Sequence, residues 1–349
     1  MTVRRRALLA GLGAAGVAGA VACTPARPDS APSPVAPGAG PPVAKVRAVT
    51  AAARATTLLV AYDLDADADP AVVLRDVHER LDDAPAIVSV GASLFDRHPG
   101  LARPRLLTAM PAFPADVLDE RWCHGDVLVQ TSGPGPVVST GLRERWRMPG
   151  FHPPAPDGSV RNLFGFREGT GNPDVTDAPL IDSLLPVRRG DDEPAWCVGG
   201  SYQVVRLIQL ATAIWDGETV AEQERVFGRR KETDAPLGAP DAGYATDPEG
   251  RLTALDAHIR RANPHTRESE AHRILRRSWS YRHPDAGEGQ IFTCFQRDLE
   301  KGFVTVQRRL AGEALERYTL TFGGGYYFTL PDPSGDPSDF RGRTLVTRA

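Results

Sequence analysis

The amino-acid sequence predicts an α+β fold in which two similar halves follow each other along the chain. In the first half, three apolar runs predict strands at 57–62, 86–92 and 126–130. A segment with helical spacing lies between the first two, at 70–81. In the second half, strands are predicted at 201–210 and 290–295, and each is followed by a predicted helix, at 217–229 and 299–310. Strands and helices in this succession are typical of a ferredoxin-like unit.

The helices are predicted from the spacing of their apolar residues. In the segment 70–81 these residues recur every three or four positions, and in the last helix Phe303, Val306 and Leu310 share one face. The stretches 132–160 and 231–252 are rich in Gly, Pro and Asp, which predicts loops. The two halves share no visible sequence repeat, so the duplication is predicted from the order of the elements alone.

The N-terminus has the pattern of an export signal. Arg4-Arg5-Arg6 precede the uncharged run 7–22, which is rich in Ala, Gly, Leu and Val. This run is too short and too small-sided for a membrane-spanning helix. Adjacent arginines before such a run indicate the twin-arginine route, which exports folded proteins. We therefore predict a signal peptide at 1–22 and a protein exported across the cytoplasmic membrane, to the periplasm or the cell exterior.

Cys23 ends the signal in a way that allows two interpretations. The segment Ala20-Val-Ala-Cys23 fits a cleavage site between small residues, and it also approximates a lipobox in which Cys23 is lipidated. A Pro/Ala-rich stretch follows, so residues 23–55 are predicted to form a flexible tether. The folded domain is predicted at 56–349, with halves at about 56–190 and 191–349. A lipid on Cys23 would be its only attachment to a membrane.

Charge and cysteine content exclude several classes of protein. The chain of 349 residues has a formal net charge of −3, whereas nucleic-acid-binding domains are usually strongly basic. The four cysteines form no C-x-x-C pair, which argues against a zinc ribbon or a thioredoxin site. No disulfide is expected, and Cys294, within an apolar run, is predicted to be a buried thiol.

Three segments carry ordered motifs, and they are listed by sequence: Gly165-Phe-Arg-Glu-Gly-Thr-Gly-Asn-Pro173, His258-Ile-Arg-Arg-Ala-Asn-Pro-His265 and Arg273-Ile-Leu-Arg-Arg-Ser-Trp279. Together they resemble the dye-decolorising (DyP-type) peroxidase family, in particular its secreted, deferrochelatase-like branch. The resemblance covers roughly residues 57–349. It implies ferredoxin-like halves whose antiparallel sheets pack together, and one haem b per chain. It also implies a reaction in which hydrogen peroxide oxidises organic donors, such as dyes and phenolics, by one-electron steps.

The resemblance assigns His258 as the axial ligand of the haem iron. Histidine is the commonest metal ligand among side chains, and haem iron in a peroxidase is usually held by one. His124 lies in a Cys-His-Gly-Asp turn and is interpreted as structural. The sequence contains no H-E-x-x-H motif that would indicate a zinc enzyme.

Glu168 and Arg276 are the predicted catalytic residues. The fixed charge of Arg276 would stabilise the negative charge that develops on the leaving oxygen of peroxide. The family usually has aspartate where this chain has Glu168, and two outcomes stay open. Glu168 either carries a proton between the two peroxide oxygens, or swings away and leaves Arg276 as the main catalyst. Alternatively, Arg276 and Arg277 bind the haem propionates or face solvent.

The resemblance also implies which residues surround the haem. Gly169, Thr170 and Gly171 would let the backbone approach the ring, with the Thr170 hydroxyl donating to a propionate. Asn263, Pro264 and His265 would make a second contact with the haem edge, although the family has arginine where this chain has His265. Aromatic residues near the motifs either conduct oxidising equivalents or pack in the core; they are Trp279, Tyr281, Tyr326 and Tyr327.

Two functions of different classes fit these observations. The first is a haem b peroxidase, and the alternative is a haem-handling protein that releases iron from haem. A binding module without haem would lack the haem absorption band. Whether the chain forms a homo-oligomer is left open by the sequence.

Overall fold

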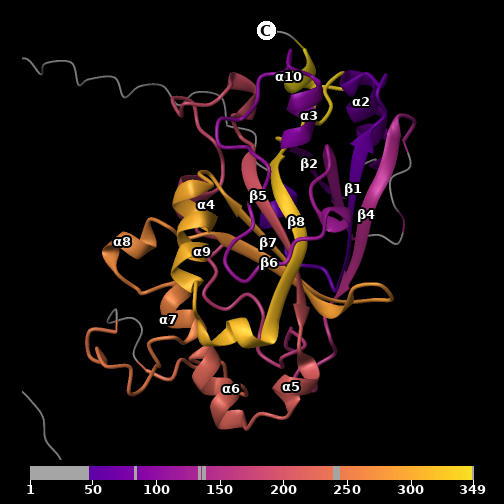
Figure 1. The fold of residues 1–349 in the computed structure, drawn as a ribbon. Helices are drawn as coiled ribbons and strands as arrows, with labels where there is room; N and C mark the ends of the chain where they lie inside the picture. The colour runs from indigo at the N-terminus through magenta and orange to yellow at the C-terminus, as the bar shows by residue number, and fades with distance from the viewer. Residues whose placement is uncertain (1–46, 82–84, 133–134, 136–138, 239–243, 348–349) are drawn as a thin grey trace, which may run out of the picture. The chain divides into compact units, whose positions relative to one another are not determined.

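The computed structural model describes residues 47–81, 85–132, 135, 139–238 and 244–347. Within these residues, eight antiparallel strands form a closed barrel in the order β1-β3-β2-β8-β5-β7-β6-β4 (Figure 1). The strands are β1 (Thr56–Leu64), β2 (Ile87–Gly91), β3 (Val127–Thr131), β4 (Leu142–Phe151), β5 (Ser201–Leu210), β6 (Leu275–His283), β7 (Gly287–Gln296) and β8 (Thr319–Thr329).

The two predicted halves are visible in the strand order. In the first half the order is β4-β1-β3-β2, and in the second it is β8-β5-β7-β6. Both halves therefore place their fourth, first, third and second strands side by side, and the predicted α+β fold with two ferredoxin-like halves is confirmed. Pairing of β2 with β8 and of β4 with β6 joins the halves into one barrel.

Short helices cover the outside of the barrel. They are α1 (Arg47–Thr50), α2 (Pro70–Leu81), α3 (Ala92–Arg97), α4 (Ala178–Leu184), α5 (Thr212–Asp216), α6 (Val220–Phe227), α7 (His258–Ala262), α8 (Arg267–Glu270), α9 (Thr305–Leu310) and α10 (Arg343–Val346). Helix α10 packs on α2, and α7 packs on both α6 and α9 (Figure 1). A π-helical turn, Glu300–Val304, leads directly into α9, so the predicted helix 299–310 has two geometries.

The inside of the barrel is a core that both halves share. Leu59 and Leu128 from the first half and Val205 and Ile291 from the second are completely buried in one cluster. Alternate residues of the strands point outward, where the helices cover them. Because each half supplies only part of this cluster, neither half buries its inner face by itself.

One predicted loop was wrong. The stretch 132–160 contains the ten-residue strand β4, which pairs along its length with β1. Its sequence, Leu-Arg-Glu-Arg-Trp-Arg-Met-Pro-Gly-Phe, contains four charged residues among ten, and its burial alternates only near the C-terminal end. Strands β6 and β8 were also not predicted, because arginines interrupt the first and three glycines the second. These strands are decided by pairing with their neighbours rather than by local composition.

The folded domain begins earlier than predicted. Residues 47–55 were assigned to the tether, yet Val49 in α1 is buried, and Arg277 in β6 donates hydrogen bonds to the Val49 and Ala51 carbonyls. The Trp279 indole also donates to the Arg54 carbonyl, at 3.0 Å. The predicted signal at 1–22 and residues 23–46, including Cys23, lie outside the described residues. Among the described helices, none is long and apolar enough to cross a membrane.

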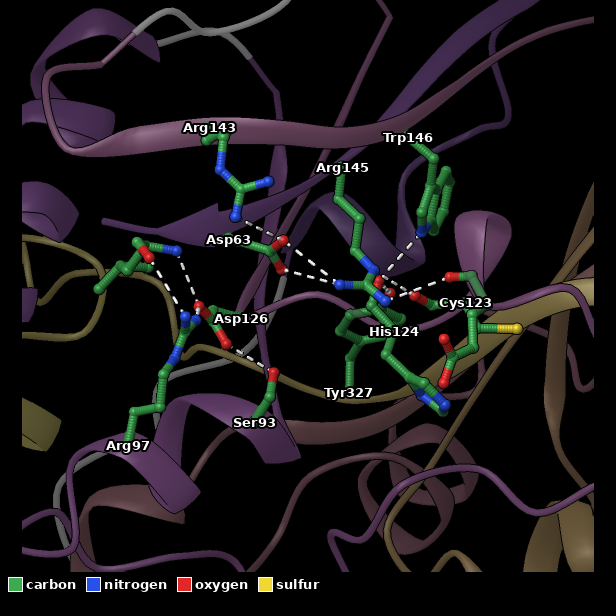
Figure 2. A network of polar contacts seen from close by, with 12 residues as sticks. Asp63, Ser93, Arg97, Cys123, His124, Asp126, Arg143, Arg145, Trp146 and Tyr327 are labelled. Carbon is green, nitrogen blue, oxygen red and sulfur yellow. Dashed lines mark hydrogen bonds and ion pairs between the residues drawn. The ribbon is translucent and has the colours of Figure 1, made fainter. Parts of the chain in front are cut away.

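The Cys-His-Gly-Asp turn is structural, as predicted for His124. Figure 2 shows Trp146 and Tyr327 pointing at the His124 carbonyl, to which both donate hydrogen bonds. The Asp126 carboxylate is completely buried and accepts hydrogen bonds from the Leu64 amide and the Ser93 hydroxyl (Figure 2). This turn thereby ties β1, β3, β4, β8 and α3 together at one end of the barrel.

The cysteines within the described residues are free thiols. Cys123, Cys197 and Cys294 are all buried. Burial raises the pKa of Cys123 to about 11, so its thiol stays protonated and unreactive at neutral pH. The prediction that Cys294 is a buried thiol is confirmed.

Candidate active site

A cavity of about 500 Å³ lies against the outer face of the second half. This volume falls in the range of roughly 300–1,000 Å³ that is usual for small-molecule sites. Strands β5 to β8 supply one part of the wall, and helices α7 and α9 supply another. The apolar lining includes Ile208, Phe227, Phe292, Phe303, Leu310 and Leu315. Glu168, Arg276 and His258 also line the cavity, which therefore brings the three main predicted site residues together.

Glu168 is held by amide groups. The side-chain Nε2 of Gln290 donates to Glu168 Oε1 at 3.0 Å, and the nearby Asn162 side chain also favours the ionised carboxylate. Surrounding protein raises the pKa of Glu168, because burial penalises the carboxylate charge. The charge of Arg276 and the two amide donors oppose this increase. The glutamate therefore faces the cavity from a defined position.

Arg276 in β6 is fixed at both its backbone and its side chain. The Asn172 side chain accepts from the Arg276 amide at 3.0 Å and donates to the Arg276 carbonyl at 2.9 Å. The guanidinium donates to the Thr170 carbonyl at 2.6 Å. Burial lowers the pKa of Arg276, but an arginine remains charged at any physiological pH. The motif 165–173 thus orients Arg276, although 104 residues separate Asn172 from it.

His258 begins helix α7, and its ring is oriented by a carboxylate. The Nδ1 atom of His258 lies 2.6 Å from Oε2 of Glu313, and the Glu313 side chain is only 10% exposed. The ring of His258 also packs on Phe227, with ring centroids 5.9 Å apart. Because Nδ1 is engaged by Glu313, Nε2 is the atom that remains to bind a metal.

The Gly169-Thr170-Gly171 segment lines the cavity, as its predicted role beside the haem requires. Both glycines have positive φ angles, of 82° and 78°, which side chains rarely adopt. A Cβ atom on Gly171 would meet protein atoms only at 3.7 Å or more, so within the protein it is the backbone conformation that requires this glycine. The Thr170 hydroxyl donates to the Asp234 carboxylate, so it is committed to a protein partner.

Two residues of the Asn263-Pro264-His265 segment lie in the cavity wall. Asn263 and His265 line the cavity, whereas Pro264 lies in the turn after α7 and not in the wall. The Asn263 side chain accepts hydrogen bonds from the His265 amide and the Ser269 hydroxyl, so it stabilises this turn. His265 faces the ring of Tyr244, with centroids 6.1 Å apart.

The aromatic residues near the motifs pack in the core. Tyr281 and Tyr327 are completely buried inside the barrel, in the cluster shared by both halves. Trp279 and Tyr326 are also buried, at 5% and 4% exposure. Of the two roles left open, the structure supports packing for these four side chains.

Comparison with known proteins agrees with the residues gathered here. Residues 43–138 match the family described as Dyp-type peroxidase, N-terminal, and residues 159–334 match Dyp-type peroxidase, C-terminal. The chain belongs to the DyP-type peroxidase family. As a DyP-type peroxidase it is a haem-dependent oxidoreductase that uses peroxide and oxidises organic donors.

Curated relatives and solved structures lie at moderate distance from this DyP-type peroxidase. The Deferrochelatase of Shigella flexneri serotype 5b (strain 8401) is 46% identical over 289 residues, covering 74% of this chain and 68% of that protein. The DyP-type peroxidase from Cellulomonas bogoriensis is 31% identical, with a TM-score of 0.71 over 84% of this chain and 94% of the other. DtpA from Streptomyces lividans is 29% identical, with a TM-score of 0.72 over 85% and 94%.

The cavity of this DyP-type peroxidase fits haem b, the cofactor of the family, in its chemistry. Its apolar walls suit the flat face of a porphyrin. Among the described residues, His258 has a hydrogen-bond partner only at Nδ1, which leaves Nε2 for a metal, and histidine is the usual iron ligand of peroxidases. Side chains that can donate hydrogen bonds to propionates also line the cavity; they are Arg229, His265 and Arg273.

Sequence reasoning missed three residues of the site. Asn172 lies within a recognised motif, yet no local signal shows that it holds the backbone of Arg276. Glu313 lies 55 residues from His258, and Gln290 lies 122 residues from Glu168. The alternation of residues along β7 gives one hint, because Gln290 lies on the same strand face as Phe292, and both line the cavity.

Proposed function

We propose that Glu168 and Arg276 act on hydrogen peroxide, and that His258 holds the haem iron. The observation that carries this proposal is the convergence of three distant segments on one cavity, each with a side chain suited to peroxide chemistry. A haem held here would supply the redox chemistry that O–O cleavage requires, with one electron from the iron and one from the porphyrin ring. The roles below belong to the protein's own residues.

His258 would bind the iron through Nε2. Its Nδ1–H donates to the Glu313 carboxylate, which fixes the orientation of the ring and makes it a stronger ligand. Arg229, His265 and Arg273 would pair with the propionates. A hydrogen bond from Arg229 to the Asp234 carbonyl, at 3.0 Å, holds this arginine at the cavity wall.

Glu168 would move a proton between the two oxygens of peroxide. An ionised carboxylate accepts the proton from the first oxygen and returns it to the second, which then leaves as water. Burial raises the pKa of Glu168 towards the pH at which the enzyme works, and a carboxyl group with such a pKa both accepts and returns a proton more readily.

Arg276 would stabilise the charge that develops on the leaving oxygen. Its guanidinium is held in place before the reaction by the Thr170 carbonyl, so no reorganisation is needed when charge appears. This proposal keeps both side chains in the reaction, which is the first of the two outcomes left open by the sequence.

Rapid mixing with peroxide tests these roles. Glu168→Gln keeps the shape of the side chain but removes its basicity, and should slow the peroxide-driven change in the haem spectrum by roughly 10²–10⁴-fold. Arg276→Leu should slow the same step. If Glu168→Gln reacts at the parental rate while Arg276→Leu does not, Arg276 carries the chemistry and the glutamate is a bystander.

A second function, release of iron from haem, is favoured by one observation. The curated relatives that match at 45–46% identity are named Deferrochelatase. The two activities are separated by incubating the haem-loaded protein with an iron chelator, with and without peroxide and a phenolic donor. Porphyrin fluorescence together with chelated iron would support iron release, and donor oxidation with intact haem would support the peroxidase alone.

We also propose that the protein is exported by the twin-arginine route. The support is the sequence pattern Arg4-Arg5-Arg6 followed by the uncharged run 7–22. Replacing Arg5 and Arg6 with lysine should leave folded enzyme in the cytoplasm, measured by cell fractionation. Cys23→Ser then separates the two forms of export, because loss of membrane association would indicate a lipid anchor and no change would indicate a free secreted protein.

A further inference from the structure

We infer that Gln290 is a positioning residue for Glu168, and that it compensates for the extra methylene that distinguishes this glutamate from the aspartate usual in the family. The inference rests on the proposed role of Glu168 as a proton carrier. It concerns the chain's own side chains, and it explains how a longer carboxylate can work at a site built for a shorter one.

Gln290 starts from a rigid base. It lies in the middle of β7, where its backbone pairs with Ile208 of β5 on one side and Ser280 of β6 on the other. From there its amide reaches into the cavity and donates to Glu168 Oε1 at 3.0 Å. A donor anchored in the centre of a sheet moves little, so the oxygen that accepts from it is held in one place.

The backbone of Glu168 is equally well defined. Its amide donates to the Val160 carbonyl at 2.9 Å, next to a bridge between Arg161 and Arg167. The remaining conformational freedom of Glu168 is therefore in its side chain. A glutamate has one more rotatable bond than an aspartate, and each added bond multiplies the number of staggered conformations.

A second amide also favours the carboxylate. Asn162 Oδ1 accepts from the Phe164 and Phe166 amides, which fixes the orientation of the group, and the Asn162 side chain stabilises the ionised form of Glu168. Both amides are neutral. They orient the carboxylate without cancelling its charge, whereas direct pairing with Arg276 would tie up the base and the cation together.

The test combines two substitutions with two measurements. Gln290→Met and Gln290→Leu both remove the donor and keep an apolar side chain of similar size. Gln209→Met is the matched control. Gln209 lies on β5 and pairs with Gly289 of β7, but it is not part of the cavity wall, which its neighbours Ile208 and Leu210 line. Crystal structures of each variant report the Glu168 conformation, and rapid mixing of the haem-loaded protein with peroxide reports the rate.

If Gln290 positions Glu168, both variants should show Glu168 in more than one conformation. The peroxide step should slow by about 10–100-fold, the effect of one hydrogen bond to a charged group, with the KM for the organic donor unchanged. The same substitutions should have little further effect in a Glu168→Gln background, where no base remains to be oriented. They should also have little effect with Glu168→Asp, which is too short to reach the Gln290 amide.

The inference is overturned if Glu168 keeps one conformation in both variants and the rate stays parental, or if the slowing is equally large in the Glu168→Gln background. A parental rate in Glu168→Gln alone is a different result. It would remove the acid–base role of Glu168 itself, so failure of the inference and failure of the proposed function are distinguishable.

Discussion

At the scale of single residues, the site depends on partners that hold each functional group in one orientation. His258 has Glu313, Arg276 has Asn172 and Thr170, and Glu168 has Gln290. In each case the partner restricts rotation of a side chain that would otherwise populate several conformations. The reactive groups are therefore preorganised, which is the property that makes charge stabilisation effective in an enzyme.

Glu313→Gln should weaken haem retention and change the haem spectrum, because a neutral amide is a poorer acceptor for the His258 Nδ1–H than a carboxylate. A loss of roughly 10–100-fold in haem affinity is expected, the range usual for such partners. Haem transfer to a competing apoprotein measures this loss. His258→Ala sets the upper limit, and Glu300→Gln, on the surface, is the control. Unchanged retention in Glu313→Gln would show that the contact does not support the ligand.

The pH dependence of the peroxide step follows from Glu168. Only the ionised carboxylate accepts a proton, and its ionised fraction falls as pH drops through its pKa. Because burial raises this pKa above the ordinary value of about 4.3, activity should decline at a higher pH than for an exposed glutamate. Stopped-flow rates measured across the acidic range give the midpoint. The Glu168→Gln variant should lack this midpoint, and an unchanged profile would assign it to another group.

At the scale of elements, β5 is tied to the loop before β3 by a buried ion pair. The guanidinium of Arg206 contacts both carboxylate oxygens of Asp116, and the two side chains are 5% and 2% exposed. Arg206 also stacks over Phe113 and Phe303. Both partners line the cavity, so the pair shapes one of its walls.

Asp116→Asn should destabilise the protein by about 3–5 kcal/mol, because it leaves the Arg206 charge buried without a counter-ion. Urea unfolding of the parent and the variant measures the change in free energy. The exposed pair of Asp76 and Arg80 in α2 provides the control, since its loss should cost about 0–1 kcal/mol. If both substitutions lowered the free energy of unfolding by the same amount, burial would not be the reason that the Arg206–Asp116 pair stabilises the protein.

At the scale of the whole molecule, the described chain is stabilised by closure of the barrel and by the segment before it. Residues 47–55 cover the β6 arginine and tryptophan, and Val49 joins a buried cluster with Leu275 and Phe295. This segment adds apolar burial to the end of the barrel where the second half meets the first.

A chain that starts at Thr56 should therefore be less stable than one that starts at Arg47, by about 3 kcal/mol or more. The loss combines burial of Val49, about 1.5–3 kcal/mol, with hydrogen bonds of roughly 1 kcal/mol each. Thermal unfolding of the two truncated chains measures the difference. Equal melting temperatures would show that the segment only lies on the surface.

Local signals accounted for much of the fold. The strand 201–210 and the helix 70–81 were predicted with the bounds that the structure has, because their apolar residues follow a clear period. Strand β4 was missed because four of its ten residues are charged, three of them consecutive, and no pattern in the sequence encodes its pairing with β1. The end of the tether was misplaced for the same reason, since its contacts are made by backbone carbonyls.

The sequence by itself determined the α+β class with its two halves, the family, and the identity of the residues that face the cavity: Glu168, Arg276 and His258. Those properties reside in local periodicity and in motifs whose members are close along the chain. Only the tertiary structure decided which groups orient them, because Gln290 and Glu313 approach their partners across 122 and 55 residues. A single hydrogen bond between distant segments needs one donor and one acceptor, and leaves no repeating pattern in the sequence to reveal it.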